Sequence, residues 1–297
     1  MTPARLSSRP DSLGDALRLL ADALLRERAL FASGVAGIGL GLVGLLVAGV
    51  HGPIIEPEGV LSKAITFDIA LGIYVLTISL FVPLARFSAK GLARWRLWHV
   101  GLTCVAYGLE NIQIARGLDP RFTMAGSPLD QALGGVFFLV ASGLIVLFVM
   151  LAARLFSRQS GSDLLFLATR YAFACTILAF GAGLWMSLIG GPSSGAASIL
   201  PLHAVGFHGL QAVPAVALAA AWAGLADRAA RRWIHLAGLA WLGACVTITV
   251  QTAVGRPLLE ASMLPVVTLL LLLGWGVVFL RAASSWLAAQ PSAVAAR

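Results

Sequence analysis

Eight long apolar segments alternate with short polar connections along this 297-residue chain. Each is about 20 residues long, the helix length that crosses a hydrocarbon core of about 30 Å. They run over Leu30–Val50, Ile65–Ala85, Leu97–Ala115, Leu133–Leu155, Thr169–Gly190, Pro201–Leu225, Trp233–Ala253 and Ser262–Ala283. The pattern predicts an all-α integral membrane protein, a bundle of about eight transmembrane helices, with one transmembrane domain over 30–283 and a tail over 284–297.

A different periodicity precedes the first apolar segment. Ser12 stands in the position of a helix N-cap, and leucines at helical spacing follow it at Leu13, Leu17, Leu20 and Leu24. Acidic and basic side chains occupy the opposite face. Residues 1–29 are therefore predicted to form a cytoplasmic N-terminal amphipathic segment that lies on the inner leaflet.

The basic residues divide unevenly between two sets of connections. The chain holds 21 Lys and Arg against 13 Asp and Glu, and all but four of the 21 fall on alternate connections. The exceptions are Lys63, Arg116, Arg121 and Arg256. The positive-inside rule then places both termini in the cytoplasm. The basic excess is explained by topology, so we expect a lipid bilayer as partner, no nucleic acid, and a bacterial-type cytoplasmic (inner) membrane.

The two halves of the chain show a weak similarity. A shift of 136 residues lays His99 on His235 and Arg96 on Arg232, and aligns the second apolar segment with the sixth. Identities along this shift are few. They suggest a four-plus-four parallel pseudo-repeat as a hypothesis.

The third apolar segment carries a line of polar residues. At about 100° per residue, one helix face holds His99, Thr103, Ala106, Glu110 and Gln113. Such a stripe cannot face lipid, so it is predicted to face the interior of the bundle. Two interpretations stay open: Glu110 pairs with Arg116 or a neighbouring helix and locks the packing, or it is a ligand, a proton acceptor or a coordinating carboxylate.

The sixth apolar segment carries two histidines. His203 and His208 lie about 140° apart around the helix, so they cannot chelate one ion as an i, i+4 pair does. His208 shares a face with Gln211, and Gly206 and Gly209 beside them allow close approach of a neighbouring helix or a flat cofactor. His203 is interpreted as a hydrogen-bonded boundary residue or a metal ligand, and His208 as a ligand or proton carrier.

Other polar positions have simpler interpretations. Asp68 lies about one turn inside the outer end of the second segment, where it either snorkels or accepts from Arg116 or Arg121. His99 and His235, near the inner ends and flanked by tryptophans, are interpreted as members of an interfacial belt. Ser127 and Ser262 are predicted helix caps, and the uncharged "GGPSSGAAS" has the composition of a flexible connection.

These positions predict one polar site in the outer half of the bundle. The expected roles are catalytic for Glu110, His208 and Asp68, cofactor-binding for Arg116, Gln113, Gln211 and Arg256, and metal-ligating for His203, His208 and Glu110, with Gln251 nearby. Imidazole and carboxylate suit transition metals, and Arg beside a carboxylate suits a haem propionate or a quinone oxygen.

Three functions are compatible with this site. The first is membrane oxidoreductase or electron-transfer activity with haem, a transition-metal ion or quinol, and with quinone or a membrane protein as partner. The alternatives are a proton-coupled transporter or permease, in which Asp68 and Glu110 carry protons, and a structural subunit of a membrane complex. The sequence favours the first.

Overall fold

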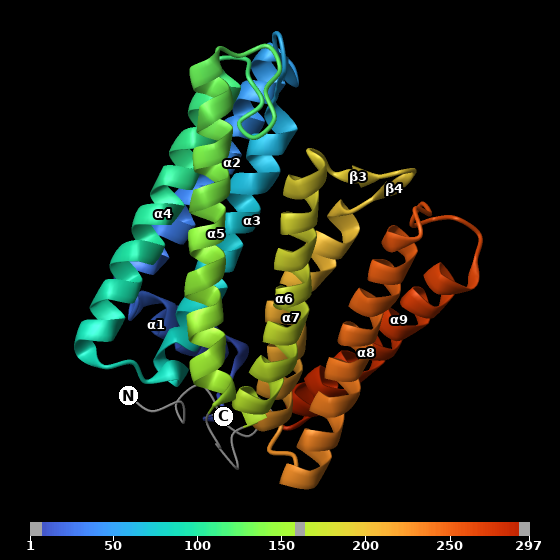
Figure 1. The fold of residues 1–297 in the computed structure, drawn as a ribbon. Helices are drawn as coiled ribbons and strands as arrows, with labels where there is room; N and C mark the ends of the chain where they lie inside the picture. Colours follow the sequence, from blue (N-terminus) through green and yellow to red (C-terminus); the bar gives the residue numbers. More distant parts are fainter. Residues whose placement is uncertain (1–7, 158–163, 291–297) are drawn as a thin grey trace. The chain divides into compact units, whose positions relative to one another are not determined.

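The computed structural model describes residues 8–157 and 164–290, which are almost entirely helical (Figure 1). The helices are α1 (Leu13–Leu25), α2 (Arg28–His51), α3 (Leu61–Phe81), α4 (Ala89–Ala115), α5 (Pro128–Phe156), α6 (Leu164–Ile189), α7 (Leu200–Trp222), α8 (Asp227–Ala253) and α9 (Met263–Ala288), with a short 3₁₀ helix η2 (Val82–Ala85). Two antiparallel hairpins join β1 (Ile54–Ile55) to β2 (Gly59–Val60) and β3 (Ser193–Ser194) to β4 (Ala197–Ser198). The end of the tail, 291–297, lies outside the described residues.

Seven helices in the described residues are long and apolar enough to cross a membrane: α2, α3, α5, α6, α7, α8 and α9. The chain is therefore a multi-pass membrane protein. Helix α4 has the length of α8, but its polar stripe leaves it without a stretch as apolar as those of the seven. Whether α4 completes an eight-helix bundle stays a prediction.

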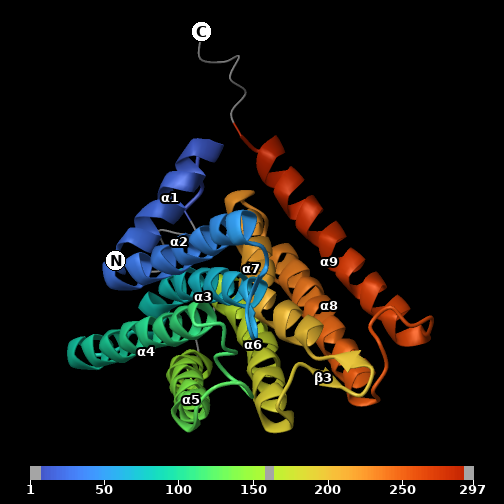
Figure 2. The same cartoon turned by 90° about the horizontal axis from the view of Figure 1, so that it is seen from above.

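The chain divides into two compact units, Leu24–Arg154 and Leu155–Arg297, the latter together with the N-terminal segment. We call them the α2–α5 unit and the α6–α9 unit, and each is described by itself. Both follow the same order: a helix, a short hairpin and three further helices. The helices are labelled in Figures 1 and 2, and the β3–β4 hairpin in Figure 1.

Two pairs of corresponding elements share one offset along the chain. Helix α8 (Asp227–Ala253) begins and ends 138 residues after α4 (Ala89–Ala115), and β4 (Ala197–Ser198) follows β2 (Gly59–Val60) by the same 138. At this offset Gln251 matches Gln113. Gly255 also matches Gly117, and both glycines end their helix with a positive φ, +72° and +75°. At this offset His99 falls on Ala237, so the bounds of α4 and α8 do not pair His99 with His235 as the 136-residue shift does, although the four-plus-four order of elements is present.

Glycines allow α2 and α3 to pack closely. A Cβ atom placed on Gly34 would lie 2.9 Å from the backbone oxygen of Gly72, and one on Gly37 would lie 2.8 Å from that of Asp68 and collide with the Tyr107 hydroxyl. Small residues at a crossing let two backbones approach, which drives helix association in lipid. In the other unit the glycine lies on the second helix of the pair: a Cβ on Gly206 of α7 would lie 2.8 Å from the Cys175 oxygen of α6.

Replacing Gly37 with alanine should therefore destabilise the protein by about 1–3 kcal/mol, since the added methyl group would collide with the Tyr107 hydroxyl and the Asp68 backbone oxygen. Gly39, on the same helix, is the matched control: no atom outside its own helix lies within 4 Å of a Cβ there. Gly39→Ala should leave stability unchanged or raise it by up to about 1 kcal/mol. Thermal unfolding in detergent measures both, and equal melting temperatures would contradict the packing described.

The amphipathic N-terminal helix is confirmed as α1. The Ser12 hydroxyl accepts from the backbone N–H of Asp15 at 3.1 Å, and so caps the helix. Leu13 and Leu17 are exposed, while Ala16 is buried. Exposed leucines agree with a face that contacts lipid, and the position of α1 on the inner leaflet stays a prediction.

One connection is more ordered than its composition indicates. The segment "GGPSSGAAS" was expected to be flexible, but Ser193 pairs with Ser198, and Ser194 with Ala197, in the β3–β4 hairpin. A positive φ of +61° at Gly195 supplies the turn, a conformation that glycine adopts at no steric cost. The corresponding β1–β2 hairpin has no glycine in its turn and was not predicted.

Candidate functional site

The polar stripe of α4 faces the interior of the α2–α5 unit, as predicted. Its members expose at most 2% of their surface: His99, Thr103, Ala106, Glu110 and Gln113. The interpretation of His99 as a belt residue is wrong, because His99 is fully buried and packs on Trp95 and Tyr74. Polar side chains that are completely buried must find their hydrogen-bond partners inside the protein.

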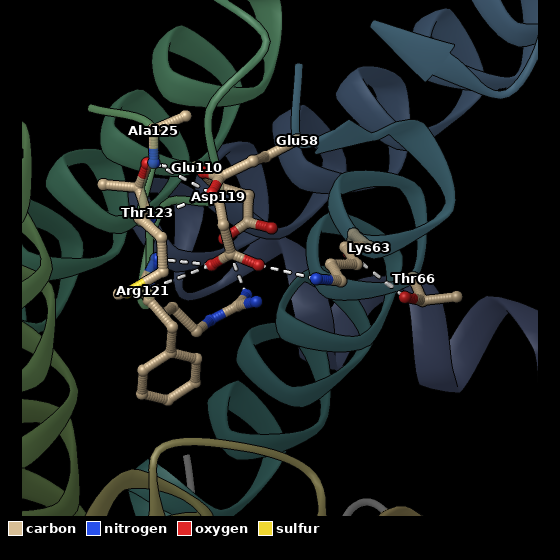
Figure 3. Close-up of polar contacts among 10 residues, drawn as sticks. Glu58, Lys63, Thr66, Glu110, Asp119, Arg121, Thr123 and Ala125 are labelled. Atoms are coloured by element: carbon tan, nitrogen blue, oxygen red, sulfur yellow. Dashed lines mark hydrogen bonds and ion pairs between the residues drawn. The ribbon is translucent and has the colours of Figure 1, made fainter. Parts of the chain in front are cut away.

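Glu110 forms an ion pair with an arginine from the connection between α4 and α5. Its Oε2 accepts from the Arg121 guanidinium at 2.6 Å, while Oε1 has no hydrogen-bond partner among the described residues. The guanidinium also lies over the rings of Phe67 and Phe137, at 5.0 and 4.9 Å. The expected partner of Glu110, Arg116, is therefore not the one observed. Figure 3 shows Glu110 beside Arg121 and Asp119.

Asp68 is the second fully buried carboxylate of this unit. Its Oδ2 accepts from the Asn111 side-chain amide at 2.9 Å, and Oδ1 has no partner among the described residues. The expected donors, Arg116 and Arg121, do not form this bond, although Arg121 lies within electrostatic reach of both carboxylates. Asp68, Asn111, Glu110 and Arg121 together are called the buried carboxylate site.

A network in the α4–α5 connection holds Arg121 in place. Asp119 accepts from Lys63 Nζ at 2.6 Å with one oxygen, and from the backbone N–H groups of Arg121 and Phe122, at 2.9 and 3.0 Å, with the other (Figure 3). Partial burial raises the pKa of Asp119, but the hydrogen bonds from Lys63 and the two N–H groups outweigh it and hold the pKa below its usual value. Asp119 is thus a carboxylate that fixes the turn carrying Arg121.

Glu58 ties the β1–β2 hairpin to the same connection. Its carboxylate accepts from the Thr123 hydroxyl at 2.6 Å and from the backbone N–H groups of Met124 and Ala125, both at 2.9 Å. The Thr123 and Met124 bonds lower the pKa of Glu58. Glu58, Lys63, Asp119 and Arg121 therefore lock one end of the unit across two connections.

Arg116 belongs to a separate cluster at the start of α5. Its guanidinium binds Asp130 Oδ1 at 2.5 Å and Gln113 Oε1 at 2.6 Å. Asp130 in turn accepts from the Ser127 hydroxyl and backbone N–H, at 2.7 and 3.0 Å. The Ser127 hydroxyl accepts from the Asp130 backbone N–H at 3.4 Å, which confirms Ser127 as a cap. Ser262 occupies the N-cap position of α9, without a side-chain capping bond. Arg116 and Gln113 thus fix the α4–α5 connection, and a cofactor-binding role for them stays untested.

The remaining expected site residues belong to the α6–α9 unit. His203 Nδ1 lies 2.9 Å from the Ala179 carbonyl oxygen, the hydrogen bond expected of a boundary histidine, whereas His208 is exposed on α7 and Gln211 is half-buried. Gln251 donates to the Pro257 carbonyl at 2.7 Å. Arg256 lies 3.8 Å from Glu260.

The predicted metal ligands come from both units. Glu110 lies in one unit and His203 and His208 in the other, so a single outer cluster that contains all three stays a prediction. Within residues 8–157 and 164–290, no group of three or more His, Cys, Asp or Glu side chains is arranged to hold a metal ion.

Sequence reasoning missed several members of the site. Asn111 of the buried carboxylate site was not selected, and neither were Asp119 and Glu58 of the network around it. Lys63 was named only for its charge, and Arg121 for its charge and as a donor to Asp68. The available signal was position in the sequence. Asn111 follows Glu110 directly, and Asp119 begins the turn that carries Arg121. Local pattern could not show that the hairpin residue Glu58 bonds a segment about 65 residues later.

The α6–α9 unit contains none of these charges at corresponding positions. At the 138-residue offset the charged members of the network correspond to uncharged residues: Asp68 to Gly206, Glu110 to Ile248, Asp119 to Pro257, Arg121 to Leu259, Lys63 to Pro201 and Glu58 to Ala196. The same order of helices and hairpin forms in both units. The charge network is therefore not what this arrangement of elements requires.

Comparisons of the chain with protein-family models, with curated proteins and with solved structures found no match.

Proposed function

We propose that the protein is a proton-coupled membrane transporter whose proton-binding group is Glu110. One observation carries the proposal: two fully buried carboxylates, Asp68 and Glu110, each use one oxygen in a bond and keep the other without a partner in the described residues. An intramembrane carboxylate is expensive and marks proton or ion pathways in transporters.

The ion pair offers a way to couple protonation to motion. A proton on Glu110 neutralises the carboxylate and removes the charge that holds Arg121. The Arg121 side chain is 27% exposed and belongs to the connection fixed by Asp119, so it can leave Glu110 for water without unfolding the helices. Release of Arg121 would loosen the connection between α4 and α5 on one side of the unit. A coupled solute would enter or leave through that change.

The two units share one order of elements, while the charges of the network lie in the α2–α5 unit, and this difference supports the assignment. In our proposal the α2–α5 unit carries the chemistry and the α6–α9 unit provides a matching half without charge. A purely structural role for the charges is less favourable, because apolar packing of similar volume is often as stable as a buried ion pair. The alternative of a structural subunit predicts that the charges are dispensable for activity.

The redox function that the sequence favoured stays an untested proposal. It requires His203, His208 and Glu110 to act on one haem, metal ion or quinol, and these residues belong to different units. Transport ranks above it because it needs only groups that lie within one unit. Quinone and protein partners likewise remain proposals without a supporting contact.

The proposed topology places both termini in the cytoplasm of a bacterial-type inner membrane. Single cysteines at two exposed positions test it in a background without the native cysteines: Ser193→Cys in the β3–β4 hairpin and Ala226→Cys between α7 and α8. An impermeant thiol reagent should label the first in intact cells and the second only after lysis. The reverse labelling would invert the topology.

A pH jump on proteoliposomes adsorbed to a solid-supported membrane tests the proposed function directly. Proton binding within the membrane domain should displace charge and give a transient current that is absent from protein-free vesicles. No transient at any starting pH would contradict proton binding. Steady acidification of the vesicle interior without any coupled solute would indicate a proton channel in place of a coupled carrier.

A further inference from the structure

A second set of buried polar groups lies toward the N-terminal end of α4. His99 is fully buried, and neither ring nitrogen has a hydrogen-bond partner among the described residues. Its ring stacks on Tyr74, with centroids 5.9 Å apart, and lies 4.7 Å from Trp95. An imidazole withheld from water without a partner reduces stability. Its retention on the face that carries Glu110 points to a use.

The same face carries two hydroxyl groups between His99 and Glu110. Thr103 is fully buried and donates to the His99 carbonyl at 2.8 Å. The Tyr107 hydroxyl is buried without a partner among the described residues, and it borders Gly37 at the point where Gly37 also meets the Asp68 carbonyl. Tyr107 therefore reaches α3 at the level of Asp68. From His99 to Glu110 the helix rises by about 16 Å.

We propose that His99, Thr103 and Tyr107 form a proton path along α4, in which His99 is the group that exchanges protons with the side opposite Arg121. This inference rests on the proposed function. Imidazole can accept a proton on one nitrogen and release one from the other, which suits it to a relay. Thr103 and Tyr107 both donate and accept through a hydroxyl group, so a proton moves toward Asp68 and Glu110 without a net charge staying on either.

The neighbours of His99 are aromatic rings or groups that already have partners. On α3 the neighbour of His99 is Tyr74, and Phe148 of α5 packs on Tyr74 in turn. The Leu147 carbonyl of α5 accepts from the Trp95 indole N–H at 2.9 Å. The nearest charges along α4 belong to Arg96, which binds Glu27 through two bonds of 2.5 and 2.6 Å. That pair neutralises itself, so we assign proton exchange at this end of the stripe to His99.

Variants of His99 test the path by the side from which protons arrive. The pH jump is applied to vesicles sealed in the two opposite orientations. In His99→Phe, charge movement triggered from the side of the α4 N-terminus should slow at least about tenfold, while that triggered from the Arg121 side stays unchanged. His99→Gln, which keeps a polar side chain that does not titrate, should behave in the same way. His235→Gln is the matched control, because His235 is an exposed imidazole bonded to Tyr171 in the other unit.

The outcomes separate the two proposals. Wild-type rates from both sides in folded His99 variants, with a signal that still depends on Glu110, would overturn the path and leave the proposed function standing. Equal slowing from both sides would indicate a structural effect of the substitution and would also overturn the path. Absence of charge movement in the wild-type protein would overturn the proposed function and the path with it.

Discussion

Glu110→Gln should abolish the transient current that a pH jump produces in proteoliposomes. Glutamine keeps the size of glutamate and a carbonyl oxygen that can accept from Arg121 at the observed 2.6 Å position, but it cannot bind and release a proton. The charge displaced should fall to the level of protein-free vesicles, because the side-chain amide at position 110 does not take up a proton.

Glu56→Gln is the matched control for this variant. Glu56 is an exposed carboxylate in the β1–β2 hairpin of the same unit, so its loss removes the same charge without touching the buried carboxylate site. We expect wild-type currents from it. Full currents from a folded Glu110→Gln protein would show that Glu110 is not the proton-binding group.

Arg121→Met should destabilise the protein by about 3–5 kcal/mol at neutral pH, because it strands a charge on the fully buried Glu110. It should be the more destabilising of the two single substitutions in the ion pair. Methionine still fills the space over Phe67 and Phe137, so the loss reports charge more than packing. Glu110→Gln leaves only the Arg121 guanidinium unpaired, on a side chain that is 27% exposed, and it should cost less.

The double variant Glu110→Gln, Arg121→Met separates stability from activity. No charge is left stranded, so thermal stability should recover most of the loss seen in Arg121→Met. Activity should stay absent, since no carboxylate remains at position 110. The deficit of Arg121→Met should also shrink as the pH is lowered, because the stranded carboxylate then takes up a proton. Recovery of activity together with stability would make the site a packing device.

The sequence predicted much of the fold, for identifiable reasons. The apolar segments have the length of helices that cross a membrane, the leucines of α1 recur at helical spacing, and burial of the α4 stripe follows from the cost of polar groups in lipid. The hairpins were missed because each strand is two residues long, too short for alternation to be visible. The division into two units was suggested only weakly by residue identities.

Partner choice in the site could not be read from spacing. Arg116 lies nearer in sequence to Glu110 than Arg121 does, yet it binds Asp130, because the cap of α5 brings that carboxylate to it. Arg121 reaches Glu110 only after Asp119 folds the chain back over α4. Long-range contacts of this kind depend on loop conformation, which local pattern does not encode. The exposure of His208 likewise could not be read from its position along α7.

Infrared spectroscopy of the protein in lipid, recorded as the bulk pH is lowered, tests most directly whether the buried carboxylate site binds a proton. We predict that a carbonyl band of a protonated carboxyl group appears as a carboxylate band disappears, that it shifts in heavy water, and that it is lost in Glu110→Gln and kept in Glu56→Gln. A titrating band that is the same in Glu110→Gln as in the wild-type protein would contradict the assignment of Glu110 as the proton-binding group.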